Sequence, residues 1–226
     1  MYPFFKRILD IIISGTVFIL FLPLFIPIAI IQKLTAEGYI FYYQKRIGLH
    51  KEYFDLWKFA TMLKDSPNMG TGSITLRNDP RVTPLGKYLR STKVNELPQV
   101  INVLKGDMSI IGPRPLVDRT FQAYSPEVQE KVYNSKPGIT GIGSIVFRDE
   151  ERLISSAEIP PHEFYKLHIA PYKGALEMWY QENKSFWLDI KLIFLTAWVI
   201  LFSKSELPFK LLKDLPEKPK FLTVSL

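Results

Sequence analysis

The sequence predicts an α/β, mostly helical protein that is seated on a membrane by its N-terminal segment. Three observations lead to this fold class. Residues 11–32 form a long apolar run without a charged side chain. Residues 39–62 are rich in aromatic side chains around a turn at Gly48, which is typical of a β-hairpin. Residues 94–104 and 164–180 repeat apolar side chains at helical spacing.

The apolar run has the length of a membrane-spanning helix, but its sequence favours a re-entrant path. Pro23 and Pro27 interrupt the middle, where each removes a backbone donor and kinks a helix. Lys6 precedes the run and Lys33 follows it, although positive charge prefers the cytoplasmic side. Half of the run rises only about 15 Å as helix, roughly half the hydrocarbon thickness. We therefore expect a helix-break-helix bent near residues 22–23, with a single span as the alternative.

Three segments follow from this pattern. Residues 1–35 are expected to form the re-entrant membrane hairpin, and residues 36–184 a compact cytoplasmic domain. Residues 185–226 are expected to form an interfacial amphipathic helix and a peripheral basic tail, because charged residues leave too short an apolar stretch for a second span. Within the cytoplasmic domain, Thr83 and Pro84 predict the start of a short helix.

Composition narrows the partners. The 226 residues carry a net charge of +7, which favours phospholipid head groups, nucleotide phosphates or nucleic acid. The charge-free run is consistent with membrane lipid as a partner and gives no support to nucleic acid as one. The chain has no cysteine, so disulfides and thiolate metal sites are excluded.

The densest group of polar side chains lies between residues 90 and 115. Apolar spacing predicts a helix over residues 94–104, which Gly106 ends. Asn95 and Glu96 occupy its first turn, where the helix dipole favours an anion.

Arg114 follows on a stiff, extended backbone, because prolines flank it at positions 113 and 115. A polar helix start facing this arginine is a candidate anion site. The alternative is a capped surface helix followed by a proline-rich turn.

The run LPQVINVLKGDMSIIGPRP, preceded by KFATM and followed by KPGITG, resembles the bacterial sugar transferases. These are monotopic phosphoglycosyl transferases, which load a phosphosugar onto polyprenyl phosphate. The likeness extends from Phe5 to about Phe202. It implies a location on the cytoplasmic face of the bacterial inner membrane and a role in capsule, O-antigen or exopolysaccharide assembly.

The resemblance also implies a chemistry. In the family, an Asp–Glu pair stands at the helix start, and the Asp attacks the β-phosphate of a nucleotide-diphosphate sugar. UMP leaves, and polyprenyl phosphate then takes the phosphosugar. The resemblance implies Mg²⁺, with Glu96 as metal ligand or acid–base group and Asn95 as a polar group of the site. The positions that it implies in substrate binding are Lys58, Arg81, Arg90, Arg114, Gly138, Thr140 and Arg148.

This chain departs from the family pattern where the chemistry occurs. Asn95 stands where the attacking Asp is usual, and a neutral carboxamide has no anionic oxygen. Ala60 replaces a residue that is usually basic. The usual continuation PGITGWAQVNGR reads PGITGIGSIVFR here and keeps only the terminal Arg148. The acidic cluster at residues 149–151 is expected to be a solvated loop.

Four hypotheses remain from the sequence. The chain is a sugar or phosphosugar transferase with an altered mechanism, or a conventional phosphoglycosyl transferase in which Asn95 is an engineered substitution. It could transfer a sugar directly to a polyprenyl-diphosphate-linked acceptor and release UDP, or bind lipid phosphate as a non-catalytic scaffold. Neither the sugar nor a possible homodimer can be read from the sequence.

Overall fold

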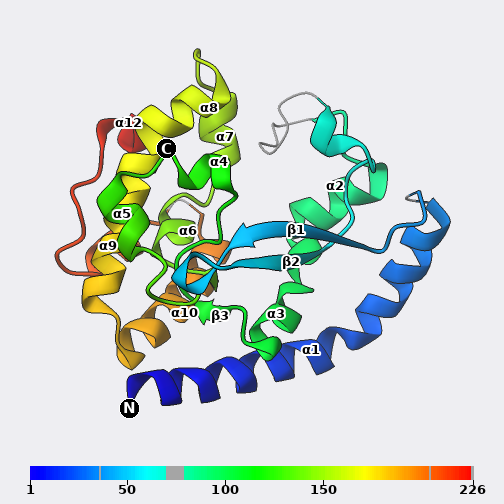
Figure 1. Cartoon of the computed structure of the whole chain (residues 1–226), viewed down its shortest axis with the longest axis horizontal. Coiled ribbons are helices and arrows are strands. Elements are labelled where there is room, and N and C mark those ends of the chain that lie inside the picture. Colours follow the sequence, from blue (N-terminus) through cyan, green and yellow to red (C-terminus); the bar gives the residue numbers. More distant parts are fainter. Residues whose placement is uncertain (36, 70–78, 204, 225–226) are drawn as a thin grey trace.

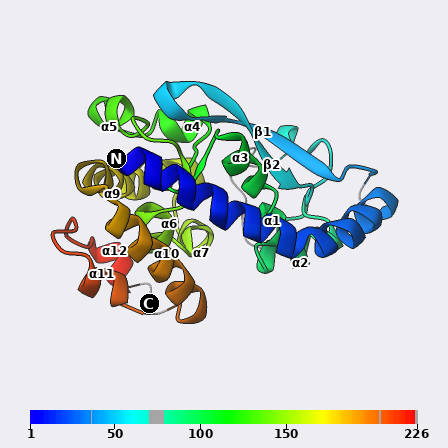
Figure 2. The same ribbon diagram turned by 90° about the horizontal axis from the view of Figure 1, so that it is seen from below.

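The structure, a computed structural model, describes residues 1–35, 37–69, 79–203 and 205–224. The long helix α1 (Tyr2–Thr35) runs along one face of a mostly helical body that holds two small sheets (Figures 1 and 2). The remaining elements are β1 (Phe41–Ile47), β2 (Tyr53–Phe59), α2 (Pro84–Ser91), α3 (Gln99–Lys105), β3 (Ser109–Ile111), α4 (Asp118–Phe121), α5 (Pro126–Lys131), β4 (Gly138–Thr140), α6 (Ile142–Val146), α7 (Glu150–Ser155), α8 (Pro161–Phe164), α9 (Ala170–Asn183), α10 (Phe186–Leu201), α11 (Leu207–Leu211) and α12 (Lys220–Val224).

The break that the sequence predicts near residues 22–23 is absent from helix α1. It is one helix with Pro23 and Pro27 inside it, and its last part curves upward toward the hairpin (Figure 1). A proline removes one backbone hydrogen bond and bends a helix without having to end it. Among the described residues, α1 is the one helix that is long and apolar enough to cross a membrane. The re-entrant path stays a prediction.

Both ends of α1 contact the same folded body. Near the N-terminus, the carboxylate of Asp10 accepts hydrogen bonds from Ser109 Oγ and from the backbone N–H of Ile110, both at 2.9 Å. Lys6 Nζ lies 2.7 Å from the buried carboxylate of Asp189 on α10.

Near the C-terminal end of α1, Gln32 donates from Nε2 to the carbonyl of Ala60 at 2.8 Å. Phe25 packs edge-on against Phe59 of β2, with ring centroids 5.3 Å apart. The opposite face of the helix is apolar and open, with exposed side chains such as Ile19 and Leu20. The helix is therefore attached at both ends and presents an apolar surface outward.

The hairpin prediction is confirmed. Strands β1 and β2 pair antiparallel, with Tyr42 opposite Lys58 and Arg46 opposite Phe54. Tyr42, Gln44 and Arg46 alternate along β1, so their side chains share one face of the hairpin. This face borders the pocket described below.

The helix predicted over residues 94–104 is divided in two. A 3-10 turn covers Val94–Glu96, and α3 begins only at Gln99, after Pro98. Pro98 has no backbone N–H to donate, which favours the start of a new helix. Gly106 ends α3 with a positive φ of 96°, as expected for a glycine cap.

A parallel pairing of β3 with β4 is the feature that the sequence did not predict. Ser109 pairs with Gly138 and Ile111 with Thr140. A Cβ on Gly138 would lie 2.2 Å from the backbone nitrogen of Gly112, so only glycine fits this close approach. The glycine-rich segment therefore forms part of a closely packed pair of parallel strands.

The core centres on α9, which is preceded without interruption by α8 and a π-helical turn, Tyr165–Ile169. Leu176 of α9 and Leu192 of α10 are fully buried in it. The C-terminal tail is not peripheral as expected, because Leu212 and Leu222 are buried in the same core. Helix α10 still exposes large apolar side chains, among them Trp187.

Candidate functional site

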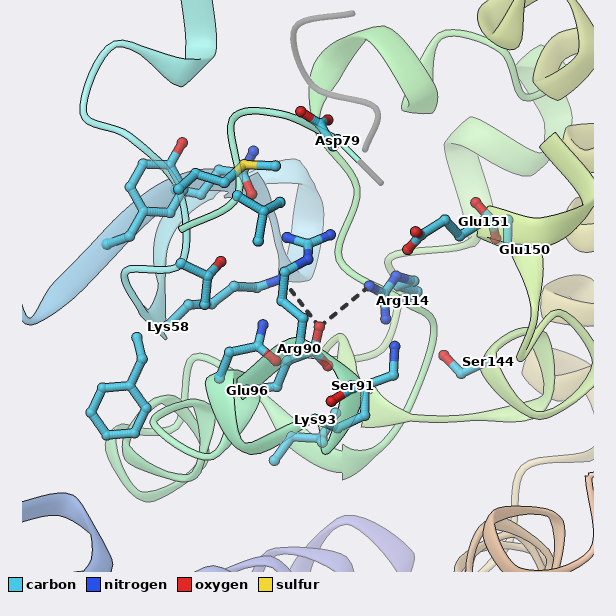
Figure 3. Close-up of a pocket in the computed structure, with 18 of the residues that line it drawn as sticks. Lys58, Asp79, Arg90, Ser91, Lys93, Glu96, Arg114, Ser144, Glu150 and Glu151 are labelled. Atoms are coloured by element: carbon cyan, nitrogen blue, oxygen red, sulfur yellow. Dashed lines mark hydrogen bonds and ion pairs between the residues drawn. The ribbon is translucent and has the colours of Figure 1, made fainter. Parts of the chain in front are cut away.

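A large open pocket lies between the hairpin, α2, the Val94–Glu96 turn and the segment from α6 to α9. Its volume is about 1790 Å³, above the roughly 300–1,000 Å³ of common small-molecule sites. The pocket can therefore hold more than one substrate. Figure 3 shows the polar side chains that line it.

Glu96 stands between two bases at one end of this pocket. Its Oε1 lies 3.2 Å from Lys58 Nζ and 3.8 Å from Arg114 Nη2, the two interactions drawn in Figure 3. Lys58 comes from β2, Glu96 from the 3-10 turn, and Arg114 from the segment between Pro113 and Pro115. Three separate segments thus bring together charges that the sequence places up to 56 residues apart (58 to 114).

Each charge in this group changes the ionisation of the others. Burial opposes the charge of Glu96, but Lys58, Arg114 and Lys93 outweigh it and hold the pKa of Glu96 well below its ordinary value. Burial lowers the pKa of Lys58 to about 8, although Glu96 works in the opposite direction. Burial, assisted by the charge of Arg114, also lowers the pKa of Arg46 to about 10. Glu96 is therefore an anion at neutral pH.

Further basic side chains surround Glu96. Arg90 and Lys93 lie near Glu96 (Figure 3), and Lys87 also lines the pocket. Lys93 precedes the 3-10 turn in a left-handed conformation with φ 60°, which is uncommon for a residue with a side chain. We call Lys58, Arg90, Lys93, Glu96 and Arg114 together the cationic end.

Asn95 lies beside Glu96 in the pocket lining and is 5% exposed. Its Oδ1 is buried and has no hydrogen-bond partner among the described residues. A buried amide oxygen without a partner is uncommon in folded proteins. It is available to a ligand that supplies a donor or a cation.

Not every implied position reaches the pocket. Arg81 is buried and does not line it; its guanidinium pairs with Asp79 at 2.6 Å and also donates to the carbonyl of Ser66. Gly138 lies in the parallel β3–β4 pair and does not line the pocket. Arg81 and Gly138 are engaged in contacts that support the fold, so the geometry does not support direct contact of either residue with the substrate.

Thr140 and Arg148 do line the pocket, and both contact α10. Thr140 Oγ1 lies 3.0 Å from Thr196 Oγ1 of α10. Arg148 donates from Nη2 to the carbonyl of Ile200 at 3.3 Å, while its Nη1 is buried without a partner among the described residues. Both residues connect the pocket wall to α10.

The prediction of a solvated loop for the acidic cluster is wrong, because Glu150 and Glu151 begin helix α7 and Glu150 pairs with the fully buried Lys173 of α9. The sequence analysis missed Lys173 and Tyr165, which also line the pocket. No local spacing connects them to the central motif. Arg46 was missed as a site residue too, although its period-two spacing with Tyr42 and Gln44 is a usable signal.

The part of the pocket beyond Arg114 has a different character. Ser144 Oγ and the hydroxyl of Tyr165 are buried without a partner in the part of the chain that the structure describes. The side chain of Phe147 and the Lys173–Glu150 pair complete this wall. We call Ser144, Phe147, Glu150, Tyr165 and Lys173 the neutral end.

Oxygen donors suited to Mg²⁺ are few. The described residues contain no group of three or more His, Asp or Glu side chains that could hold a metal ion. Mg²⁺ is commonly held by one or two carboxylates together with substrate phosphates. The Glu96 carboxylate and the unpartnered Oδ1 of Asn95 fit such a shared ion and do not form a complete protein site.

Comparison with known proteins identifies relatives over most of the chain. The family model for bacterial sugar transferases matches residues 1–203. The UDP-glucose:undecaprenyl-phosphate glucose-1-phosphate transferase of Klebsiella pneumoniae is 35% identical over 204 residues, 89% of this chain and 41% of the relative. The undecaprenyl-phosphate galactose phosphotransferase of Salmonella typhimurium is 32% identical over 213 residues, 88% of this chain and 40% of the relative.

A relative of similar length also matches. The exopolysaccharide production protein ExoY of Rhizobium meliloti is 30% identical over 215 residues, which are 89% of this chain and 87% of the relative. By contrast, the chain spans 36–44% of the length of the first four curated relatives. Since the family model covers nearly the whole chain, the protein belongs to the bacterial sugar transferase family.

Proposed function

We propose that the protein transfers a phosphosugar from a nucleotide-diphosphate sugar to polyprenyl phosphate at a membrane surface. The observation that carries this proposal is the cationic end, where Glu96 is held between Lys58 and Arg114 in a pocket with a surplus of bases. Such a group binds diphosphate through charge-assisted hydrogen bonds. The relatives from Klebsiella pneumoniae and Salmonella typhimurium are named for this class of transfer, and the relative from Rhizobium meliloti is named for exopolysaccharide production.

The donor's diphosphate lies against Arg114, Arg90 and Lys58 in this proposal. Arginine binds phosphate oxygens in pairs, and a buried lysine adds a point charge. These cations would stabilise the negative charge that spreads over the transferred phosphoryl group in the transition state. Glu96, an anion at neutral pH, keeps the bases oriented toward one point.

The amide of Asn95 leads us to propose a single displacement. An oxygen of polyprenyl phosphate attacks the β-phosphorus of the donor, and the bond from that phosphorus to the bridging oxygen breaks. The bridging oxygen leaves with the nucleoside monophosphate, so polyprenyl-diphosphate sugar and UMP form together. An amide side chain is too weak a nucleophile to form the phosphosugar-enzyme intermediate that the family resemblance implies.

Mg²⁺ belongs to the proposal as an ion shared with the substrate. Glu96 would hold it, with the amide oxygen of Asn95 as a weaker ligand. When bound, it supplies neutralisation of phosphate charge. The chain's own bases orient the diphosphate independently of the ion.

We also propose that the site faces the cytoplasm from the inner leaflet of the bacterial inner membrane. Supporting this, Lys6 and Gln32, at opposite ends of α1, both contact the folded body, while Ile19 and Leu20 between them are exposed. A helix that spans the bilayer would separate these ends. The native chain has no cysteine, so Pro3→Cys and Lys33→Cys are clean probes. A membrane-impermeant maleimide should label both from the cytoplasmic side, and periplasmic labelling of Pro3→Cys would contradict the re-entrant path.

The function itself is tested by nucleotide product analysis. Purified protein in lipid nanodiscs is given UDP-sugars, Mg²⁺ and polyprenyl phosphate, and released nucleotides are separated by chromatography. Equal amounts of UMP and polyprenyl-diphosphate sugar are expected. UDP release that needs a sugar-bearing lipid acceptor would indicate direct glycosyl transfer. Neither nucleotide, over a broad donor panel, would indicate a lipid-phosphate-binding scaffold.

A further inference from the structure

The neutral end of the pocket contains polar groups for which the transfer step has no use. Tyr165 is 4% exposed and lines the pocket, yet its hydroxyl has no hydrogen-bond partner among the described residues. Ser144 Oγ lines the same wall and is likewise buried and unpartnered. Buried hydroxyl groups in folded proteins nearly always have a partner, because they lose their bonds to water. Two buried hydroxyls without a partner in one pocket wall indicate a ligand that supplies the missing hydrogen bonds.

The backbone around Tyr165 is also unusual. Tyr165 begins the π-helical turn between α8 and α9. Such turns are rare and frequently occur at functional sites, because they reorient a side chain relative to a regular helix. Here the turn runs directly into α9, whose inner face is buried and also provides Lys173. The tyrosine is therefore held rigidly at the pocket wall.

Charge distinguishes this wall from the cationic end. Lys173 is neutralised by Glu150 and lies 5.6 Å from the ring centroid of Phe147. Among lining residues 139–200, three are basic and three acidic, whereas lining residues 37–120 include seven basic and three acidic ones. The neutral end therefore has no surplus charge for a phosphate. It offers an apolar ring, two hydroxyls and a carboxylate.

Arg114 connects the two ends. In Figure 3 it lies between Glu96 on one side and Ser144 and Glu150 on the other. Desolvation opposes the charge of Arg114, but Glu96 and then Glu150 outweigh it and raise the pKa of Arg114. A diphosphate bound at Arg114 would consequently place its next group against the neutral end.

We infer that the neutral end is a subsite for the sugar of the donor, an inference that rests on the proposed donor. A sugar hydroxyl can both donate and accept a hydrogen bond. Sugar hydroxyls can therefore accept a hydrogen bond from the hydroxyl of Tyr165 and donate one to the carboxylate of Glu150, while the hydroxyl of Ser144 can act as donor or acceptor. The ring of Phe147 offers an apolar surface to the sugar's C–H face. If the neutral end bound the nucleoside of the donor instead of its sugar, the binding of UDP alone would also depend on these residues.

Isothermal titration of the full-length protein in nanodiscs with Mg²⁺, without lipid acceptor, tests the subsite. The probes are UDP and a panel of UDP-hexoses and UDP-N-acetylhexosamines. Tyr165→Phe removes only the hydroxyl. We expect about three- to tenfold weaker binding of the preferred UDP-sugar, as for one lost hydrogen bond, with UDP unchanged. The ligand-free Tm should not fall, because the hydroxyl has no protein partner to lose.

A matched control and a second variant exclude a general effect on folding. Tyr172, on α9 and outside the pocket lining, donates its hydroxyl to the carbonyl of Pro216 at 3.0 Å. Tyr172→Phe should lower Tm and leave every binding constant unchanged. Ser144→Ala should weaken UDP-sugar binding selectively, as Tyr165→Phe does.

Three results would overturn the inference: wild-type protein that binds UDP-sugars no more tightly than UDP, variants that bind every probe like the wild type, or variants that weaken UDP and UDP-sugars equally. The last result would assign the wall to the nucleoside. Failure of the proposed function is visible separately, as an absence of transfer to lipid while the sugar-dependent binding persists.

Discussion

The two ends of the pocket differ in how their polar side chains are paired. At the cationic end, Glu96 has charged partners in Lys58 and Arg114, which help to hold its pKa well below the ordinary value. At the neutral end, the buried hydroxyls of Ser144 and Tyr165 have no hydrogen-bond partner among the described residues, and the charge of Lys173 is cancelled by Glu150. A group of bases can hold any phosphate, whereas unpaired hydroxyls select a ligand by its shape and hydrogen bonds. In the proposed reaction, the cationic end would supply affinity for the diphosphate and the neutral end selectivity for the sugar.

The largest effect is expected from Arg114→Ala. Loss of this guanidinium removes the donor that the diphosphate shares with both ends, so kcat/KM should fall by about 10²–10³-fold. Glu96→Gln should reduce activity similarly, because it frees Lys58 and removes the metal ligand. Steady-state UMP release measures both. Arg119→Ala, at an exposed arginine of α4 outside this pocket, is the control and should be unaffected. A full rate in Arg114→Ala would remove that residue from the site.

A smaller effect is expected from pH at the cationic end. Burial lowers the pKa of Lys58 to about 8, so Lys58 carries its charge below that pH and loses it above. We expect kcat/KM to fall about fivefold between pH 8 and pH 9, as the free enzyme loses this proton. The groups around Lys58 are Glu96, Arg46 and Arg114, and the pKa values of the last two lie above this range.

Lys58→Arg separates this titration from other effects of alkaline pH. Arginine keeps its charge, so the fall should disappear over the same range even if the maximum rate is lower. A decline near pH 8 that persists in Lys58→Arg would show that another group titrates, and Lys58 would lose its assigned role.

The smallest effect is expected at Glu177, beneath the neutral end. Burial raises the pKa of Glu177 to about 8 from its ordinary 4.5, against the opposing charge of Lys173 and the backbone N–H of Arg114. Between these values the unfolded chain binds fewer protons than the folded one, so the free energy of unfolding falls as pH rises. Glu177→Gln should remove this slope and raise Tm at pH 8 by a few degrees. Scanning calorimetry at pH 5 and pH 8 measures it, with the exposed Glu182→Gln as control. An unchanged slope would mean that Glu177 is charged in the folded state.

Much of the fold could be predicted from local patterns. The hairpin followed from period-two aromatic residues, the start of α2 from the Thr83 cap, and the end of α3 from Gly106. Each depends on neighbouring residues only. The β3–β4 pairing was missed because it joins Ser109 to Gly138, and no local pattern predicts parallel pairing across such a distance.

The site was predicted at its cationic end and missed at its neutral end for the same reason. Glu96 and Arg114 lie in one sequence motif, so they could be proposed together. Tyr165 and Lys173 reach the pocket from the buried face of the α8–α9 helix, where their spacing looks like ordinary core packing. Arg81 resembled a phosphate contact, but the neighbouring Asp79 already binds its guanidinium. Sequence reports a charge, and only the fold shows whether that charge is already paired.

Single-turnover release of labelled UMP, with and without polyprenyl phosphate, tests the direct transfer at the cationic end most directly. With Asn95 in place, UMP should appear only when the lipid is present, because no protein group attacks the donor. Asn95→Asp, which restores a carboxylate, is the positive control and should release up to one UMP per protein without lipid. A lipid-independent burst of UMP from the native chain would contradict a single displacement.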